Sequence, residues 1–267
     1  YANNIKNSAV VFMYHKFGIS KYPSTNVTIE QFEAHINEFI KTKYNIESLN
    51  YIVDTIINDG NLSENTIGIS VDDADRSFLN TAWPIFKENN IPVTLFVNTS
   101  TIVKNNKNYL NWDEIRLLKK EGVEIGAHSH THAHMPDLDL IEIKNEIEKS
   151  NKIFLKELGE IPMIFAYPYG EADERIIELL KEYKYKVAFG QHSGVINETS
   201  NLTVITTEIT DFIPYQVPSG KKLVVLNYVG GEIRLEGSFV FTDQWSTGMP
   251  IIIPAGISIE TQNNFNL

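Results

Sequence analysis

Short apolar runs alternate with amphipathic helical patterns from the start of the chain to about Ser200. The runs are rich in β-branched residues and are apolar at successive positions, which is typical of parallel strands buried on both faces. The strands predicted in this way are Ala9–His15, Thr66–Val71, Val93–Asn98, Val123–Ala127, Met163–Tyr167 and Val187–Gly190. The helices predicted between them are one capped by Thr28 and containing Phe32, Ile36 and Phe39, then Leu49–Asn58, Phe78–Asn89, Trp112–Glu121, Leu140–Leu158 and Asp173–Glu182. This alternation predicts an α/β domain with a parallel sheet.

The parallel sheet is expected to close into a barrel, because no glycine-rich nucleotide-binding loop follows the first strand. The pattern changes after about Ser200, where helical periodicity stops. Strands are predicted there at Leu202–Ile209, Lys222–Tyr228, Glu232–Phe241 and Ile251–Glu260, with a hairpin signal at Gly230-Gly231. We therefore expect a barrel domain over residues 1–205 and a small β-rich C-terminal module over residues 206–267, whose role the sequence does not indicate.

Composition limits the possible function classes. The chain has 267 residues and 42% hydrophobic content, enough for one barrel-sized domain or a smaller domain with an added module. The formal net charge is -11 and no basic stripe is visible, so nucleic acid is not an expected partner. The absence of cysteine excludes disulfides and thiolate metal sites. No apolar run is long enough to span a membrane, and nothing indicates the oligomeric state.

Two groups of polar residues follow predicted strands. Asp72-Asp73 comes directly after Thr66–Val71, and His128 comes directly after Val123–Ala127. Both therefore belong at the same end of a barrel. An Asp-Asp pair alone is more typical of a turn or a helix N-cap. Combined with His-x-x-x-His it predicts a metal site, in which one carboxylate binds the ion and its neighbour accepts a proton.

The histidines occur at alternate positions: His128, His130, His132 and His134. A surface tract that binds metal nonspecifically is one interpretation. If the segment turns like a helix after the strand, spacing of four places His128 with His132, or His130 with His134, on one side. Spacing alone does not choose between these pairs.

Three motifs occur together and in order: Val71-Asp72-Asp73, His128-Ser129-His130-Thr131-His132, and Phe165-Ala166-Tyr167-Pro168-Tyr169-Gly170. In this combination the chain resembles the polysaccharide deacetylases with a NodB homology domain, carbohydrate esterase family 4. Val11-Phe12-Met13-Tyr14-His15 and Tyr109-Leu110-Asn111-Trp112-Asp113 are similar to its extracytoplasmic bacterial branch, which includes poly-N-acetylglucosamine deacetylases. The resemblance covers about residues 8–197.

The resemblance implies a distorted (β/α)7 barrel and a divalent metal, usually Zn²⁺, although Co²⁺, Ni²⁺ or Fe²⁺ also suits such ligands. It implies hydrolysis of N-acetyl groups from polymers containing N-acetylglucosamine, with release of acetate. By position in the motifs, Asp72 would be the general base, and Asp73, His128 and His132 the metal ligands. The backbone N–H of Tyr169 would stabilise the oxyanion, and Ser129 would support the loop.

Two departures from the family pattern concern acid–base chemistry. Many members carry an Arg two residues before the motif Pro, where this chain has Ala166. The family usually places a catalytic acid His after a late strand, and His192 is the only late candidate here. Tyr14-His15, at the end of the first strand, is expected either to line the pocket or to be buried and hydrogen-bonded.

The sequence therefore predicts a metal-dependent glycan N-deacetylase acting on an N-acetylated polymer. The glycan itself is left open among poly-N-acetylglucosamine, peptidoglycan and chitin. One alternative is a catalytically silent glycan-binding protein with a deacetylase-like fold, and another is a metal amidohydrolase acting on small amides. The expected location is extracytoplasmic, with a signal peptide lying outside the given chain.

Overall fold

The computed structural model describes residues 7–103, 106–191, 194–197 and 200, together with short strands between residues 223 and 261. The chain divides into two compact units. One comprises Tyr1–Phe17 with Glu38–Thr207, and the other comprises Gly18–Asn37 with Glu208–Leu267. The domain boundary expected between residues 205 and 206 stays a prediction.

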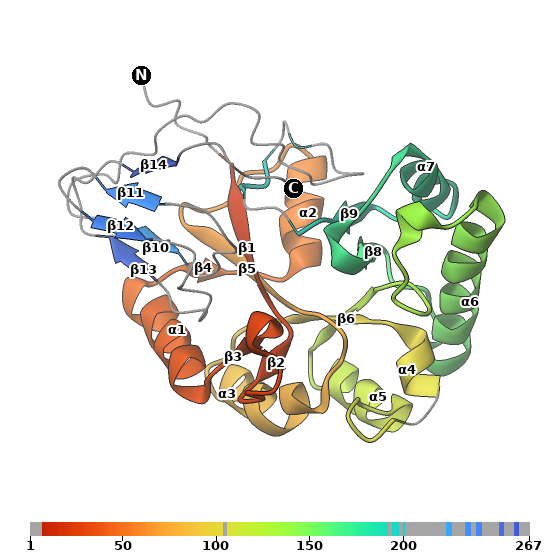
Figure 1. The fold of residues 1–267 in the computed structure, drawn as a ribbon, viewed down its shortest axis with the longest axis horizontal. Coiled ribbons are helices and arrows are strands. Elements are labelled where there is room, and N and C mark those ends of the chain that lie inside the picture. Colours follow the sequence, from red (N-terminus) through yellow and green to blue (C-terminus); the bar gives the residue numbers. More distant parts are fainter. Residues whose placement is uncertain are drawn as a thin grey trace. The chain divides into compact units, whose positions relative to one another are not determined.

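The first unit is built on a parallel sheet with the strand order β1-β5-β6-β7-β8-β9, in which β4 also pairs with β5 (Figure 1). Each strand predicted up to residue 190 is confirmed, with no end shifted by more than one residue. The observed bounds are β1 Ala9–Tyr14, β4 Asn45–Ile46, β5 Thr66–Val71, β6 Thr94–Val97, β7 Glu124–Ala127, β8 Ile164–Ala166 and β9 Val187–Phe189. The short strand β4 was not predicted.

The sheet curls so that the chain following its last strand returns to its first. Ala9 N donates to Ile196 O at 2.9 Å, and Ile196 N donates to Ala9 O at 2.8 Å. Ala9, Ile196, Phe96 and Phe189 belong to one buried apolar cluster. The expected distorted barrel is thus confirmed, with an irregular bridge in place of a regular strand pairing between β9 and β1.

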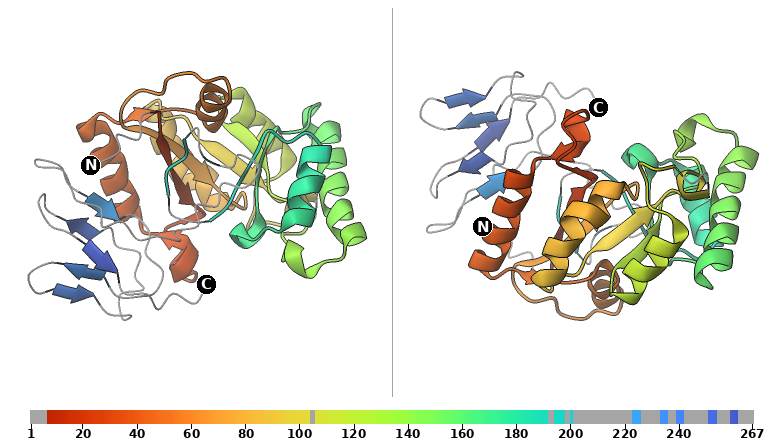
Figure 2. Two further views of the ribbon diagram at one scale, coloured as in Figure 1. Left: turned by 90° about the horizontal axis from the view of Figure 1, so that it is seen from above. Right: turned by 90° about the horizontal axis from the view of Figure 1, so that it is seen from below.

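Most helices in this unit begin at a residue whose side chain caps them. Ser48 Oγ, Asn111 Oδ1 and Asp139 Oδ1 each accept a backbone N–H of the first turn. Such capping fixes where each helix begins and so how it leaves the preceding strand or loop. The bounds are α2 Leu49–Ile57, α4 Thr99–Val103, α5 Trp112–Lys120, α6 Leu140–Leu158 and α7 Glu174–Glu182, and Figure 2 shows helices around the outside of the sheet. Short 3₁₀ turns cover Met135–Asp137 and Pro168–Gly170, and β2 covers Lys16–Phe17.

The helix predicted over Phe78–Asn89 is confirmed and contains one irregular turn. A π-helical turn covers Phe78–Ala82, and the α-helix α3 follows it directly over Trp83–Glu88. Pro84 lies next to this turn, where its nitrogen has no hydrogen to donate to the preceding turn.

The second unit contains a 3₁₀ turn at Pro23–Thr25, the strand β3 Asn26–Val27 and the beginning of α1 Ile29–Thr42. Thr28 caps α1 as predicted, since Thr28 Oγ1 accepts from Gln31 N and Gln31 Oε1 accepts from Thr28 N. Its remaining strands are β10 Leu223–Val225, β11 Ile233–Leu235, β12 Phe239–Phe241, β13 Ile251–Ile253 and β14 Ile259–Thr261.

Two expectations for the C-terminal region were wrong. Glu232–Phe241 is not one strand, because β11 and β12 within it pair antiparallel. The turn-forming pair Gly237-Ser238 was the overlooked signal. Gly230-Gly231 does not join a hairpin, because β10 pairs with β13 whereas β11 pairs with β12 and β14. The strand predicted at Leu202–Ile209 lies outside the described residues.

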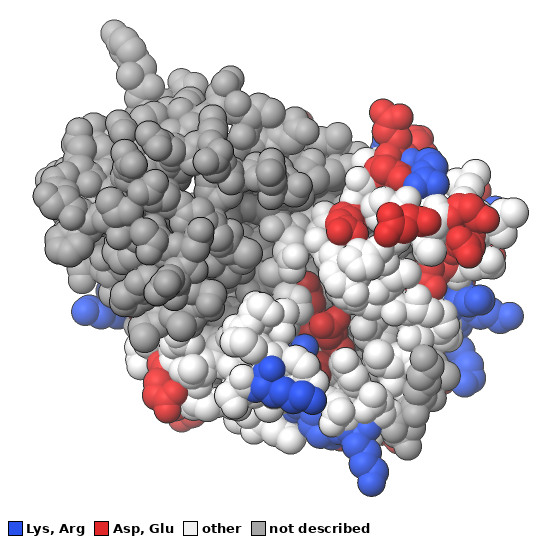
Figure 3. Space-filling model, in the orientation of Figure 1, with Lys and Arg blue, Asp and Glu red and all other residues white. Residues whose placement is uncertain are grey.

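Two surface properties bear on the expected partners. Among the described residues, none of the helices combines the length and the apolar character needed to cross a lipid bilayer. Acidic and basic side chains both occur on the described part of the face in Figure 3.

Candidate metal centre and catalytic residues

The parallel pairing of β5, β6 and β7 brings the two acidic residues and the histidine motif to one edge of the sheet. Val71, the last residue of β5, pairs with Leu95 of β6, and Val97 of β6 pairs with Ala127, the last residue of β7. The residues that follow β5 and β7 therefore leave the sheet at neighbouring positions, as the sequence predicted.

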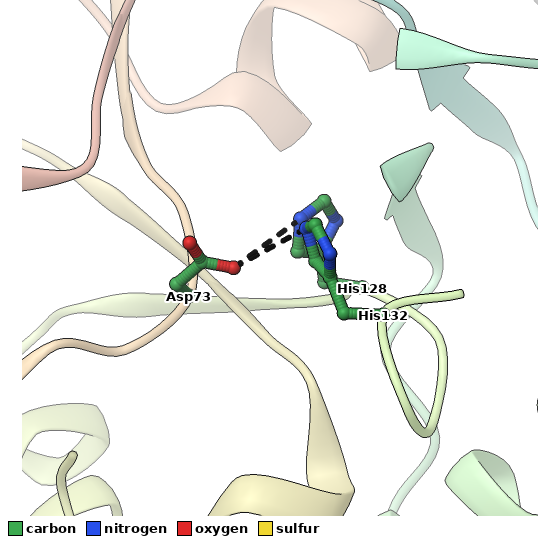
Figure 4. A group of neighbouring side chains, drawn as sticks. All are labelled: Asp73, His128 and His132. Atoms are coloured by element: carbon green, nitrogen blue, oxygen red, sulfur yellow. Dashed lines mark ion pairs between the residues drawn. The ribbon is translucent and has the colours of Figure 1, made fainter. Parts of the chain in front are cut away.

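Asp73, His128 and His132 converge on one point (Figure 4). Asp73 Oδ1 lies 3.7 Å from His128 Nε2 and 3.4 Å from His132 Nε2. Ligands about 2.1 Å from a tetrahedral zinc ion lie roughly 3.4 Å from one another. The three atoms thus have the spacing of a zinc site, and the residues present fit the metal that the motifs imply.

The imidazole of His128 is oriented for metal binding. Its Nδ1 lies 2.8 Å from the carbonyl oxygen of Ala166, and an N–H donated there leaves the lone pair on Nε2. Burial lowers the pKa of His128 to about 4, so the ring is neutral at pH 7. A neutral ring with Nε2 facing Asp73 has the form that a divalent metal requires.

The loop after β7 separates the two histidine pairs left open by the sequence. Ser129 and His132 both have positive φ, and Ser129 Oγ accepts the backbone N–H of His132 at 3.0 Å. His130 Nδ1 instead contacts Thr99 Oγ1, and His134 Nδ1 pairs with Glu171. Within the described part of the chain, the pair that forms a possible ligand group with Asp73 is His128 and His132.

Asp72 lies beside this group but differs from Asp73 in its surroundings. It is 5% exposed, and Oδ1 has no hydrogen-bond partner among the described residues. Burial, and then the neighbouring charge of Asp73, raise the pKa of Asp72 well above its usual value. A buried carboxylate oxygen without a partner is suited to accepting a proton from a small molecule that enters the site.

The backbone explains why Asp72 and Asp73 point to different neighbours. Asp72 N donates to Tyr14 O, which continues the β1–β5 pairing by one residue. Asp73 and Ala74 then adopt left-handed φ values of 73° and 54°. The chain turns sharply after Asp72, so the two carboxylates are separated in spite of being adjacent. A turn was the alternative interpretation of the pair, and here the turn itself places the candidate site.

The sequence profile of the polysaccharide deacetylase family matches residues 59–188, a segment that contains all three candidate ligands and Asp72. This segment of the chain therefore matches the polysaccharide deacetylase family. The match confirms the resemblance inferred from the three motifs. It does not by itself assign a role to any residue of the deacetylase domain.

Relatives with this domain are distant in sequence. The YxkH protein of Bacillus subtilis is 22% identical over 192 residues, which cover 72% of this chain and 67% of YxkH. A poly-beta-1,6-N-acetyl-D-glucosamine N-deacetylase of Staphylococcus aureus is 24% identical over 154 residues, which cover 53% of each protein. The chain thus matches about half the length of the staphylococcal enzyme.

Solved structures share the fold of the first unit. The deacetylase PplD of Streptococcus pyogenes aligns with a TM-score of 0.68 at 18% identity, covering 73% of this chain and 89% of PplD. IcaB from Ammonifex degensii aligns with a TM-score of 0.63 at 19% identity, covering 70% of this chain and 84% of IcaB. At these identities the similarity establishes the distorted barrel and nothing finer.

His15 is a candidate site residue to which the sequence assigned no definite role. It follows β1 directly, and its Nε2 lies 4.0 Å from Asp72 Oδ2. Burial is the main cause that lowers the pKa of His15. The charge of Asp73 acts against this and raises it, whereas His132 lowers it further. This places His15 beside Asp72, and whether it lines a pocket stays a prediction. The signal was available, because His15 occupies a strand end at the same edge as Asp72.

Lys16 and Asn98 also contact the candidate ligand Asp73. Lys16 Nζ lies 3.9 Å from Asp73 Oδ2, and Asn98 Nδ2 lies 3.4 Å from Asp73 Oδ1. Asn98 is oriented by Thr101, whose hydroxyl donates to Asn98 Oδ1 at 2.6 Å. The two oxygens of Asp73 therefore have different partners, and the oxygen that faces the imidazoles is the one near Asn98. Neither contact was predicted.

The third motif of the deacetylase domain lies next to the histidines. Tyr169 has a left-handed φ of 58°, and its ring stacks on His134 at 3.8 Å and contacts His132 edge-on at 4.5 Å. The role of its backbone N–H at the oxyanion stays a prediction. At Ala166, where the family often has Arg, the backbone carbonyl contacts His128. His192 lies outside the described residues.

Proposed function

We propose that this chain is a metal-dependent hydrolase that removes N-acetyl groups from an N-acetylglucosamine-containing polysaccharide and releases acetate. The observation that carries the proposal is the convergence of Asp73, His128 and His132 at zinc-ligand spacing beside a buried Asp72 oxygen that has no hydrogen-bond partner among the described residues. A bound divalent ion would supply Lewis acidity, activating water and polarising the acetyl carbonyl.

The proposed roles of the residues follow from their positions. Asp72 Oδ1 accepts a proton from the attacking water, while His128, held by Ala166, would be one of the residues that bind the ion. The backbone N–H of Tyr169 donates to the oxyanion, as the motif implies. The amide C–N bond then breaks, acetate leaves, and the sugar amine takes up a proton.

We infer that His15 Nε2 passes to the leaving amine the proton that Asp72 has accepted from water. His15 is the imidazole that faces Asp72 without belonging to the ligand group, and its side chain is mostly buried beside that carboxylate. The role of His192 as this acid stays a prediction. The two candidates are compared with His15→Gln and His192→Gln, measuring kcat for acetate release.

His15→Gln is expected to lower kcat by about 100-fold or more, the usual range for loss of a general acid. His192→Gln is expected to lower it by less than about threefold, as for a residue that takes no part in proton transfer. A larger loss of kcat in His192→Gln than in His15→Gln would show that His192 and not His15 donates the proton.

The substrate class rests on the family match and on the staphylococcal relative, which is a poly-beta-1,6-N-acetyl-D-glucosamine N-deacetylase. The test uses protein stripped with a chelator and then reloaded with Zn²⁺, Co²⁺, Ni²⁺ or Fe²⁺. Acetate release is measured from β-1,6-linked N-acetylglucosamine oligomers, chitin oligomers, peptidoglycan and small N-acetyl amides. We expect metal-dependent release, with the β-1,6-linked oligomers as the best substrate.

Two variants and a matched control complete this test. Asp72→Asn is expected to bind Zn²⁺ but to lose acetate release, whereas Asp73→Ala is expected to lose both. Asp113→Asn changes an aspartate whose side chain is 91% exposed, and it should affect neither. Zinc binding without acetate release from any polymer would contradict the enzyme proposal and favour a silent glycan-binding protein. Release from small amides alone would favour an amidohydrolase.

We also propose that the chain works outside the cytoplasm, where such polymers occur. The absence of cysteine is compatible with an oxidising compartment. Fractionation of the producing cells, with detection of the chain by antibody, tests this. Its recovery in the cytoplasmic fraction alone would contradict the proposal.

A further inference from the structure

The histidine loop, defined as residues 128–132, has a backbone conformation that its sequence does not favour. Ser129 and His132 have left-handed φ values of 59°, although neither is glycine. Residues other than glycine keep such values only where surrounding contacts hold them. The conformation matters because His132 is both a strained residue and a candidate metal ligand.

Glu146 supplies such contacts from α6, 15 or 16 residues farther along the chain. Its Oε2 accepts the backbone N–H of Thr131 at 2.7 Å and of His130 at 3.1 Å. Its Oε1 accepts the hydroxyl of Thr131 at 2.8 Å. The residue is only 8% exposed, so these hydrogen bonds to a carboxylate form in a site that is largely shielded from water.

The other side of the loop is held by backbone donors from α4. Ser100 N donates to His130 O at 2.8 Å, and Thr99 N donates to Ser129 O at 3.3 Å. The loop is thus fixed between α4 and Glu146. Without the carboxylate, two N–H groups immediately before His132 lose their acceptor, and buried N–H groups without acceptors are costly.

The two histidines depend on this arrangement unequally. His128 is held separately, because its N–H donates to Val97 O and its Nδ1 contacts Ala166 O. His132 N donates to Ser129 Oγ, and both of these residues belong to the loop itself. A change at Glu146 therefore acts mainly on His132.

We propose that Glu146 is a positioning residue for the metal site, holding the histidine loop so that His132 Nε2 stays directed at the ion. This inference rests on the metal site in the proposed function. It adds that affinity for the ion depends on a helix residue that is not one of the three candidate ligands.

The experiment compares Glu146→Ala and Glu146→Gln with wild type and with Glu148→Ala. Glu148 lies on the same helix, where it contacts Tyr183 and Lys144 on the surface. Zinc affinity is measured by competition with a chromogenic chelator, and the Co²⁺-loaded proteins are compared by visible absorption. Far-UV circular dichroism shows whether each variant is folded.

Glu146→Ala is expected to bind Zn²⁺ about 10- to 100-fold more weakly, the range for loss of a group that orients a ligand. Its Co²⁺ absorption should weaken as His132 leaves the tetrahedral set. Glu146→Gln should stay within about threefold of wild type, because an amide oxygen accepts both N–H groups and the amide NH₂ can donate to Thr131. Glu148→Ala should match wild type.

Folded Glu146→Ala with the zinc affinity and Co²⁺ spectrum of wild type would overturn the proposal. If this variant does not fold, the same decision is made on Thr131→Val, which removes one of the three hydrogen bonds and should weaken zinc binding by about threefold. Wild-type protein that binds no metal would instead overturn the proposed function, and this inference with it. The two failures are therefore distinguishable.

Discussion

Gly126 lies in β7, two residues before His128, where the structure leaves no room for a larger side chain. A Cβ atom added at Gly126 would lie 2.3 Å from two carbon atoms of the Phe96 ring. Ordinary carbon–carbon contacts are about 3.5–4.0 Å, so the ring would have to retreat by more than about 1 Å. We therefore expect Gly126→Ala to destabilise the barrel.

The magnitude follows from how firmly Phe96 is held. It is 1% exposed and packs against Phe189 with ring centroids 5.8 Å apart, inside the buried cluster at the closure of the sheet. Overpacking a dense core typically costs about 1–3 kcal/mol, and the short contact favours the upper part of this range. Because Ala restricts the unfolded chain more than Gly does, the substitution also adds about 0.5–1 kcal/mol of stability, which offsets part of this loss. The expected net loss is about 2 kcal/mol, or a Tm lower by about 4–8 °C.

The assay is denaturant unfolding followed by tryptophan fluorescence, with Phe96→Leu and the double variant completing a cycle. Because Leu makes room for the new methyl group, the double variant should lose at least about 1 kcal/mol less than the sum of the single variants. A loss below about 0.5 kcal/mol for Gly126→Ala, or strict additivity, would refute the account based on the Phe96 contact.

Three further predictions concern pH and metal affinity. Burial lowers the pKa of His35 from 6.5 to about 4, so between these pH values the unfolded chain binds more protons than the folded chain. The unfolding free energy should therefore fall by up to about 3 kcal/mol from pH 7 to pH 4. Denaturation measured across pH should show a smaller fall for His35→Gln, and equal slopes for the variant and wild type would contradict the prediction. Asn98→Ala should weaken zinc binding about tenfold in chelator competition, because Asp73 Oδ1 loses its contact with Nδ2, and unchanged affinity would show that the contact does not orient the ligand. Lys16→Met should strengthen zinc binding by roughly threefold in the same assay, because a cation 3.9 Å from Asp73 Oδ2 opposes a dication, and weaker binding would contradict this.

Local sequence was sufficient for much of the fold and for part of the site. Runs such as Thr66–Val71 and Val123–Ala127 are buried strands at the predicted positions, since burial on both faces requires continuous apolar residues. The caps at Thr28 and Asp173 also follow from neighbouring residues alone. Because parallel strands end at one edge of a sheet, the meeting of Asp73 with His128 was predictable from the sequence.

Pairing between distant strands was less predictable. A run such as Glu232–Phe241 was expected to form one strand and contains two, β11 and β12. Likewise, β10 pairs with β13, although a nearer partner beyond Gly230-Gly231 was expected. Strand pairing depends on which apolar faces meet in space, and a local turn signal does not determine this.

The sequence by itself determined the strand ends, the residue types of the candidate site and the family to which they point. Only the tertiary structure separated the pair His128 and His132 from the pair His130 and His134, because this depends on two left-handed residues in the loop and on the contacts of the loop with α4 and Glu146. It also placed His15 beside Asp72 and Lys16 beside Asp73. A strand end is set by residues that are neighbours in the chain. The direction of each side chain is set by groups that are distant in the sequence but close in space.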